Sequence, residues 1–522
     1  MKYTYPHWLL DVIFYLIYNL YSFLGIYIFV VVIGIITYML IYYTNIKIGK
    51  NNIVSAMITI ASIYLLQGFI TARAQIVTYI CSILTVLFIE QFLETSKKQY
   101  LIGLVLIPIL LANCHAALFP IYFVIYLPYI AEYIISYFTK EEIYQKRIYI
   151  KRKIIERLEN KISKTNDINT KDPKKDNLIK RLGNKIAKTN ESIPKKEKLI
   201  LKLEKKTKKI EQLQNKLQVI KVQESNKQRK VIIERNKNMK WILVIFVLCI
   251  FTGLLTPLKD IPYTYMIKSI KGNTMNFISE HQAVSLIYTI PTLVIMIIIV
   301  ALLFSNKIKI KLRDIFMLLG MTILALISYK QFPIFFICTM TIINKLFMQV
   351  IPDNLSQIVT NLLDKVLSIK GMVYMTLVIV ALSLVQYKKV AVQNFVDSSE
   401  YPVQAVKWIK ENSNIDIKNM RLFNDFNYGS YLLFSDIPVF IDGRADAYDP
   451  VFNGRKEDSF LDYMQASSLE IWYEDIFAKY GITHIITKTN SSFNTFLQRN
   501  IQYRSLYNDG TFIFYERLED GI

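Results

Sequence analysis

Residues 24–44 read LGIYIFVVVIGIITYMLIYYT, a run of apolar and aromatic residues without a charged side chain. A helix needs about 20 such residues to cross the hydrocarbon layer of a membrane. No water is available inside that layer, so every backbone amide must bond within its own segment, and a helix achieves this. The run therefore predicts a membrane-spanning helix.

Further apolar runs predict an α-helical polytopic membrane protein with about ten spans. Beyond 24–44 they lie at 53–70, 76–93, 118–138, 241–257, 285–304, 314–330, 332–350 and 371–387, with a shorter run at 101–113 that contains Pro108.

The first apolar run, residues 8–22, has two interpretations. It is either a further crossing or a helix lying at the outer membrane interface. Its Asp11 and its short length favour the interface, because a carboxylate inside the hydrocarbon layer is costly. On that interpretation an earlier helix precedes this sequence, and Met1 is not the start of the natural protein.

A strongly basic insertion at 139–240 interrupts the apolar pattern. The 522-residue chain has a net charge of +22, and the stretch 140–240 has 32 Lys and Arg against 13 Asp and Glu, a net of +19. RLENKISKTN at 157–166 recurs as RLGNKIAKTN at 181–190, and apolar residues from 199 onward follow a heptad spacing. Since both ends must return to the membrane, we expect an antiparallel coiled-coil hairpin.

Four roles for the insertion stay open: a solvated loop whose charge fixes topology, contact with an anionic lipid surface, contact with a protein partner, or binding of nucleic acid. Nucleic acid is not expected. No aromatic residue is interleaved with the basic residues between Lys151 and Lys240, and Lys far outnumbers Arg.

Lysine and arginine in the loops predict the orientation in the cell membrane. If the spans alternate, the basic loops share one side, which is then cytoplasmic. These loops contain Lys47 and Lys50, Lys97 and Lys98, the insertion, and Lys307, Lys309, Lys311 and Arg313. The chain then comprises membrane regions at 1–138 and 241–387, the cytoplasmic insertion 139–240 and an extracytoplasmic C-terminal domain, 388–522.

The C-terminal domain reads as a small α/β domain. Helices are predicted at 403–411, 428–434 and 455–479, and strands at 420–424, 438–442 and 484–488, with a terminal hairpin of 503–507 and 511–515 around Asn508-Asp509-Gly510. Strands that alternate with helices favour a mostly parallel sheet.

The loop after the predicted strand 438–442 contains Asp442, Arg444 and Asp446. Open α/β sheets usually bind ligands at such strand ends. The two carboxylates suit sugar hydroxyls or a cation, and the guanidinium suits a phosphate. The alternative is an internal ion pair that fixes the loop.

Four short segments carry a resemblance to a known superfamily. Residues 71–75 (TARAQ) resemble an ARPQ element, 113–115 (NCH) an NxH(G/A) element, 278–282 (ISEHQ) an ISEWxP element, and 427–444 a GGYLLW…VFIDGR segment. Together they resemble bacterial multi-pass proteins related to the C-type glycosyltransferases (GT-C), over nearly the whole chain except 139–240.

The resemblance implies a polyprenyl-phosphate-linked sugar as donor, a cell-envelope acceptor and an active site at the outer face. It also implies a carboxylate in the first outer loop. Residues 2–11 resemble the end of that loop, so we expect the first span and the loop carboxylate to be missing from this sequence. His281 and Gln282 replace the family's usual Trp after Glu280, and Lys330 stands where Arg is usual.

The residues themselves give the candidate site. Asp11 and Glu280 are the candidate catalytic carboxylates, and the candidate substrate-binding residues are Arg73, His115, Lys330, Asp442, Arg444 and Asp446. Arg73 or Lys330 would pair with a lipid phosphate, and Glu280 or Asp11 would position an acceptor hydroxyl. Each also has a structural interpretation: a snorkelling interface residue, a topology anchor, a helix-terminus residue or a solvated loop residue.

Two functions therefore stay open: a membrane glycosyltransferase, or a non-catalytic membrane protein whose GT-C-like scaffold presents an outer ligand-binding domain. A transporter is disfavoured, since no spans are broken by Gly and Pro in corresponding halves. The sequence does not identify a cofactor. Its four cysteines lack the paired spacing of a metal site or a disulfide framework.

Overall fold

The computed structural model describes residues 6–138, 231–278, 286–304, 308–350 and 395–518, with a few isolated positions between 149 and 215. It divides into two compact units. The first comprises Met1–Tyr126, Lys240–Ser305 and Met317–Ile522, and the second comprises Leu127–Met239 and Asn306–Phe316. The predicted coiled coil, the span at 371–387 and Glu280 lie outside the described residues.

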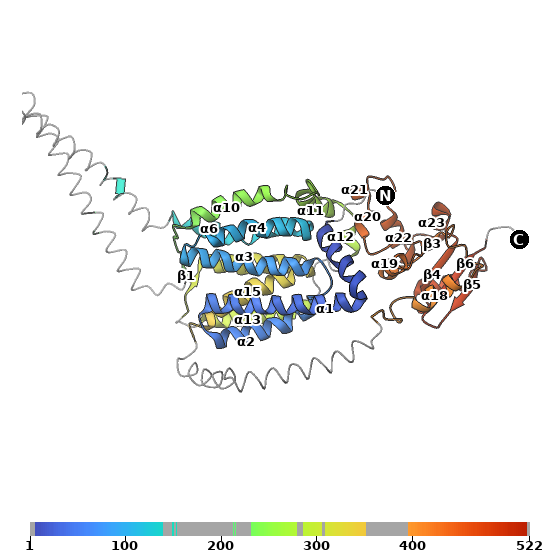
Figure 1. Ribbon diagram of the computed structural model, residues 1–522, viewed down its shortest axis with the longest axis horizontal. Coiled ribbons are helices and arrows are strands. Elements are labelled where there is room, and N and C mark those ends of the chain that lie inside the picture. Colours follow the sequence, from blue (N-terminus) through green and yellow to red (C-terminus); the bar gives the residue numbers. More distant parts are fainter. Residues whose placement is uncertain are drawn as a thin grey trace, which may run out of the picture. The chain divides into compact units, whose positions relative to one another are not determined.

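The first unit contains a bundle of apolar helices. Its elements are α1 (Trp8–Gly49), α2 (Asn52–Leu66), η1 (Gln67–Phe69), α3 (Gln75–Thr95), α4 (Gln99–Cys114), η2 (Ala116–Leu118), α5 (Phe119–Val124), α10 (Met239–Thr252), α11 (Ile261–Lys271), α12 (Thr274–Phe277), α13 (Leu286–Phe304), α14 (Leu312–Ile327), η6 (Tyr329–Gln331) and α15 (Phe332–Phe347). The central helix is α3, which packs against α1, α4 and α15 (Figure 1).

Four helical segments in the described residues are long and apolar enough to cross a membrane: Trp8–Gly49, Asn52–Phe69, Gln75–Thr95 and Ala116–Ser136. Shorter apolar helices are Gln99–Cys114, Met239–Thr252 and Ile290–Phe304. The chain is thus mostly helical and has the character of a multi-pass membrane protein. The larger number of about ten spans stays a prediction.

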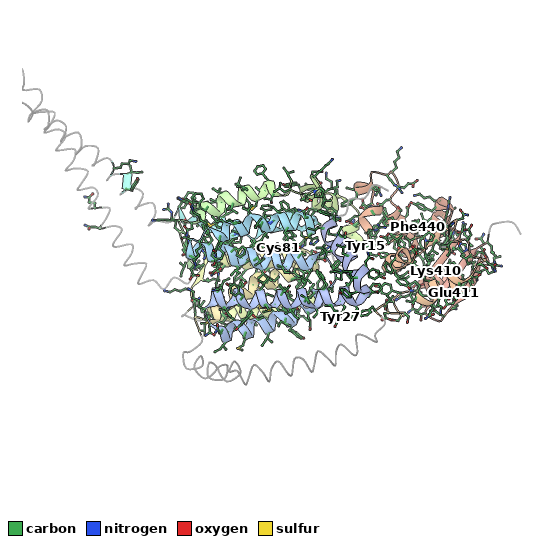
Figure 2. All side chains as sticks on the ribbon, in the orientation of Figure 1. Tyr15, Tyr27, Cys81, Lys410, Glu411 and Phe440 are labelled. Carbon is green, nitrogen blue, oxygen red and sulfur yellow. The ribbon has the colours of Figure 1, made fainter. Side chains whose placement is uncertain are left out.

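Helix α1 is broken at the end of the predicted first run. Tyr21 and Ser22 have non-helical backbone angles, and Ser22 has a φ of 54°. A short helix therefore precedes the long apolar one. The outward side chains of α1 include Tyr15 and Tyr27, whereas Cys81 on α3 is buried (Figure 2). An exposed apolar surface of this kind suits a helix that faces lipid.

The second unit joins the two flanks of the basic insertion to the strand before α14 and to the first turn of α14. Strands β1 (Val231–Ile232) and β2 (Ile310–Lys311) pair in parallel. Buried Arg313 lies 3.4 Å from Glu132 on α6 (Leu127–Ser136) and 3.5 Å from Glu234. An ion pair with so little exposure must be satisfied internally. The flanks of the insertion therefore meet residues 308–313, which comprise β2 and the start of α14, as expected if both lie on one side of the membrane.

The C-terminal domain in the first unit is a mixed α/β fold. Its helices are α18 (Val403–Glu411), α19 (Phe426–Phe434), α20 (Ala445–Tyr448), α21 (Pro450–Asn453), α22 (Ser459–Ser467), α23 (Tyr473–Tyr480) and α24 (Ser492–Leu497). Its strands are β3 (Leu422–Phe423), β4 (His484–Lys488), β5 (Tyr503–Asn508) and β6 (Phe512–Arg517), in the order β3-β4-β6-β5.

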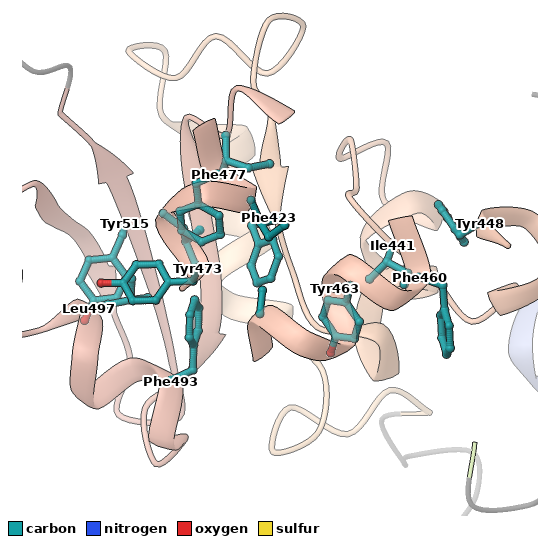
Figure 3. Close-up of a cluster of buried hydrophobic side chains, with 14 of the residues drawn as sticks. Phe423, Ile441, Tyr448, Phe460, Tyr463, Tyr473, Phe477, Phe493, Leu497 and Tyr515 are labelled. Atoms are coloured by element: carbon teal, nitrogen blue, oxygen red, sulfur yellow. The ribbon is translucent and has the colours of Figure 1, made fainter. Parts of the chain in front are cut away.

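Alternation along the strands sends side chains into two cores, one on each face of the sheet. Phe423, Ile485 and Ile513 belong to one core, and their neighbours Leu422 and Ile486 belong to the other. Phe423 is at the centre of the first core, where its ring lies 4.8 Å from that of Phe477 and 5.7 Å from that of Phe493 (Figure 3). Burial of aromatic rings therefore contributes to the stability of this domain.

Three sequence predictions for this domain were wrong. The sheet is not mostly parallel: only β3 and β4 are parallel, and β4, β6 and β5 pair antiparallel. The terminal hairpin adds its strands beside β4, which fixes this pattern. Residues 438–442 do not form a strand, and the helix expected over 455–479 is two helices separated near Leu469, which has a φ of 62°.

The side chain of Asn424 holds residues 438–442 beside β3 without a strand pairing. Its Nδ2 donates to the carbonyl oxygen of Ile441 at 2.8 Å, and its Oδ1 accepts from the amide of Phe440 at 2.8 Å. Asn424 is fully buried. One amide side chain thus replaces a pair of ladder hydrogen bonds. It holds the loop that begins at Asp442 against β3.

Gly429 lets α19 pack closely on residues 441 and 442. A Cβ at position 429 would collide with the backbone carbonyl oxygen of Ile441. Backbone cannot move aside as a flexible side chain can, so the close approach requires glycine.

We predict that Gly429→Ala lowers the free energy of unfolding of the C-terminal domain by about 1–3 kcal/mol, as overpacking does. Pulse proteolysis of the full chain in urea measures this. Gly443→Ala is the matched control, because a Cβ at position 443 would lie 3.0 Å from its nearest neighbour, the side-chain oxygen of exposed Ser430. We expect this variant to change the free energy of unfolding by less than about 1 kcal/mol. Alanine favours helices, so a stabilised Gly429→Ala would contradict the packing argument.

Candidate functional site

His115 ends α4 and is held in a buried position. Its ring Nδ1 lies 2.7 Å from the hydroxyl of Thr78 on α3. The next residue, Ala116, donates its amide to the carbonyl oxygen of Pro6 at 2.7 Å. Burial lowers the pKa of His115 well below its usual value, and the charges of Lys330 and His7 lower it further. The imidazole is therefore neutral at physiological pH.

The N-terminal segment binds to the same end of α4. Trp8 Nε1 donates to Asn113 Oδ1 at 3.3 Å, and Asn113 Nδ2 donates to the carbonyl oxygen of Leu255 at 3.0 Å. His7 Nδ1 lies 2.7 Å from a carboxylate oxygen of Asp11, which is about two-fifths exposed. Asp11 thus lies near His115 and is accessible to solvent or a ligand.

Lys330 links this cluster to the C-terminal domain. It belongs to η6, the turn between α14 and α15. Its positive charge acts both on His115 and on the carboxylate of Asp446. The ring of the preceding Tyr329 lies 5.3 Å from that of Phe69, beside the turn that contains exposed Arg73. Two cations and two carboxylates therefore occupy one end of the bundle.

The segment between α10 and α13 attaches the domain to this end. Tyr265 on α11 donates its hydroxyl to Asp446 on α20. Asn273 donates its amide to Asp449 at 2.9 Å and its Nδ2 to Asp458 at 2.7 Å. Burial raises the pKa of Asp446, and the Tyr265 hydroxyl and Lys330 only partly oppose this.

Asp442 and Arg444 form a pair within the loop. Asp442 is fully buried and accepts from Arg444 Nε at 2.9 Å, from Arg444 Nη2 at 2.5 Å and from the Tyr448 hydroxyl at 2.8 Å. Burial alone would raise the pKa of Asp442, but these hydrogen bonds outweigh it and hold the pKa below its usual value. The contacts show how the loop is fixed; ligand binding by this pair stays a prediction.

Of the candidate residues, Asp11, His115, Lys330 and Asp446 come together at one end of the bundle, with Arg73 on a neighbouring turn. Asp442 and Arg444 bond to each other. Tyr265, Thr78 and His7 are partners that the sequence did not indicate. A tyrosine in a polar loop and a threonine in an apolar run carry no local signal of a distant partner.

The candidate site therefore combines cations that suit an anionic group of a ligand with carboxylates that suit a ligand hydroxyl. Among the described residues, no three His, Cys, Asp or Glu side chains gather in a metal-binding group. The chain matches no protein-family model, and comparison with curated proteins gives no significant match. The function is therefore inferred from the residues of the site.

We predict that Asp442→Asn lowers the free energy of unfolding of the domain by about 2–3 kcal/mol at pH 7, since it weakens charge-assisted hydrogen bonds to a partly exposed arginine. The pKa of Asp442 is lower in the folded state, so its contribution is present above the ordinary carboxyl pKa of about 4 and is lost as the pH falls through the folded value. The difference between the two proteins should shrink on acidification, measured by urea unfolding at several pH values.

Asp436→Asn is the control, since Asp436 is highly exposed and lies 3.8 Å from Lys410. We expect this variant to change the free energy of unfolding by less than about 0.5 kcal/mol. If the Asp442→Asn protein were as stable as the wild type at pH 7, the hydrogen bonds of Asp442 would not stabilise the domain as predicted.

Proposed function

We propose that this chain is a membrane glycosyltransferase that moves a sugar from a polyprenyl-phosphate donor to a cell-envelope acceptor at the outer face. One observation carries the proposal. Residues from four distant parts of the sequence, Asp11, His115, Lys330 and Asp446, lie at the same end of the helix bundle. There, one lysine acts on both an imidazole and a carboxyl group.

The chemistry of these groups fits the transfer. An ammonium such as Lys330 neutralises a lipid phosphate that gains charge as the sugar leaves. A carboxylate of raised pKa, such as Asp446, is able to take a proton from an acceptor hydroxyl. Asp11 and Glu280 remain further candidates for that step, and Arg73 a second phosphate-binding group.

The different side chains at the two ends of the bundle support a proposed orientation in the membrane. At one end, Lys50 pairs with Glu94 at 2.5 Å and Lys345 with Glu90 at 3.0 Å, which links the ends of α1 and α15 to the last turns of α3. The candidate site lies at the other end. We propose that the first end and the insertion 139–240 face the cytoplasm and that the C-terminal domain is extracytoplasmic, within a fold of about ten spans.

A second function is favoured by a different observation. The domain is firmly attached by Tyr265 and Asn273, and Asp442 is occupied by its own loop. These contacts suit a non-catalytic scaffold that presents the C-terminal domain to a sugar or to another protein. Membrane lipid is a partner in both cases.

We predict that Lys330→Met lowers the rate of sugar transfer about 100-fold, as loss of one charge-stabilising group typically does. Membranes that contain the full chain are incubated with radiolabelled polyprenyl-phosphate sugars, and label in envelope glycan is counted. Asp446→Asn should also lose transfer yet stay folded at pH 7, because it removes a carboxylate whose charged form is disfavoured by burial.

Lys271→Met is the matched control, because Lys271 is exposed on α11 near the domain; we expect wild-type transfer. The non-catalytic scaffold predicts a different pattern: envelope glycan unchanged by replacement of Arg73, Glu280 and Asp442, and equal label with or without the chain.

A further inference from the structure

Three helices meet around a polar cluster at the end of the bundle away from the candidate site. The side chain of Asn344 on α15 lies between α1 and α2. Its Nδ2 donates to the backbone carbonyl of Asn45 at 2.7 Å and to Ser55 Oγ at 3.3 Å. Asn344 packs directly on Gly49, where any Cβ would touch it. Asn45, Asn344 and Ser55 are fully buried.

The amide nitrogens of this cluster donate hydrogen bonds, but several of the oxygens have no partner among the described residues. Asn45 Nδ2 donates to Thr59 Oγ1 at 3.4 Å. Among the described residues, no hydrogen bond reaches Asn45 Oδ1, Asn344 Oδ1 or Thr44 Oγ1, all of which are buried. Reversing the amide of Asn344 would place its oxygen against the Asn45 carbonyl. The cluster therefore needs a partner that brings donors or positive charge.

The surroundings favour positive charge. Both α1 and α15 end here, at Gly49 and Phe347, and a helix C-terminus carries partial negative charge. The opposing start of α2 is capped, because Asn51 Oδ1 accepts the amides of Ile53 and Val54 at 2.9 and 3.1 Å.

Two of the nearby lysines are paired with carboxylates on α3. Lys345 turns to Glu90 on α3, and Lys50 turns to Glu94. Lys47, in the last turn of α1, has its Nζ 5.3 Å from the centre of the Tyr43 ring. The ammonium groups of these three lysines are therefore directed to carboxylates or to an aromatic ring.

We propose that Asn45, Asn344 and Thr44 form part of a binding site for a monovalent alkali cation between α1, α2 and α15. The free groups are neutral oxygens of amides and a hydroxyl. Such oxygens replace the hydration shell of Na⁺ or K⁺, whereas divalent cations are usually held by carboxylates. Helix C-terminal ends bind Na⁺ in other membrane bundles. The site is independent of the proposed transfer.

The test is cation-dependent stability of the full chain in detergent. Thermal unfolding is measured in NaCl, KCl and choline chloride at equal ionic strength. We expect Na⁺ or K⁺ to raise Tm by about 2–4 °C with saturation, relative to choline. Identical Tm values in the three salts overturn the proposal and leave a buried water as the partner of these oxygens.

Two variants and a control make the result specific. Asn344→Leu removes one oxygen and should abolish the cation response. Should that variant not fold, Asn45→Asp provides the second test: its carboxylate should lower the half-saturating cation concentration about tenfold. In Ser62→Ala the lost hydroxyl bonds its own helix at Ile58, so the response should persist. An unaltered response in both Asn344→Leu and Asn45→Asp overturns the site.

Discussion

A polar group inside a lipid bilayer must find a partner within the protein, and this constraint organises the chain. Long apolar helices satisfy their own backbones and leave apolar side chains such as Tyr15 to face outward. Polar side chains are then confined to helix ends and to contacts between helices. The central helix α3 shows the result, since its Thr78 is buried and reaches the ring of His115 at the end of α4.

Because polar side chains gather at the helix ends and between the helices, each end of the bundle has its own set of polar groups. One end holds titratable groups, where Lys330 acts on His115 and Asp446 and where the C-terminal domain is attached through Tyr265. The other holds neutral amides between α1, α2 and α15, flanked by balanced ion pairs. Charge at the first end suits reaction or ligand capture. Neutral oxygens at the second suit a small cation.

Local patterns predicted the C-terminal domain well where one segment decides the structure. The helix at 403–411, the strand at 484–488 and the terminal hairpin are confirmed. The parallel sheet was wrong because pairing depends on which strands meet, and a single buried side chain, Asn424, takes the hydrogen bonds that 438–442 would give to a strand. The pattern of apolar and polar residues does not reveal that a side chain takes these hydrogen bonds, because residues 438–442 have the composition of a strand.

The sequence was enough to predict the membrane character of the protein, its basic insertion and the presence of an α/β domain, because length, hydropathy and charge act within single segments. It also indicated Asp11, His115, Lys330 and Asp446 one by one. The packing of the folded chain brings these four to one end of the bundle, pairs Asp442 with Arg444 and places Tyr265 against Asp446. The physical reason is that side-chain contacts between distant segments depend on how helices pack, and no short pattern records that packing.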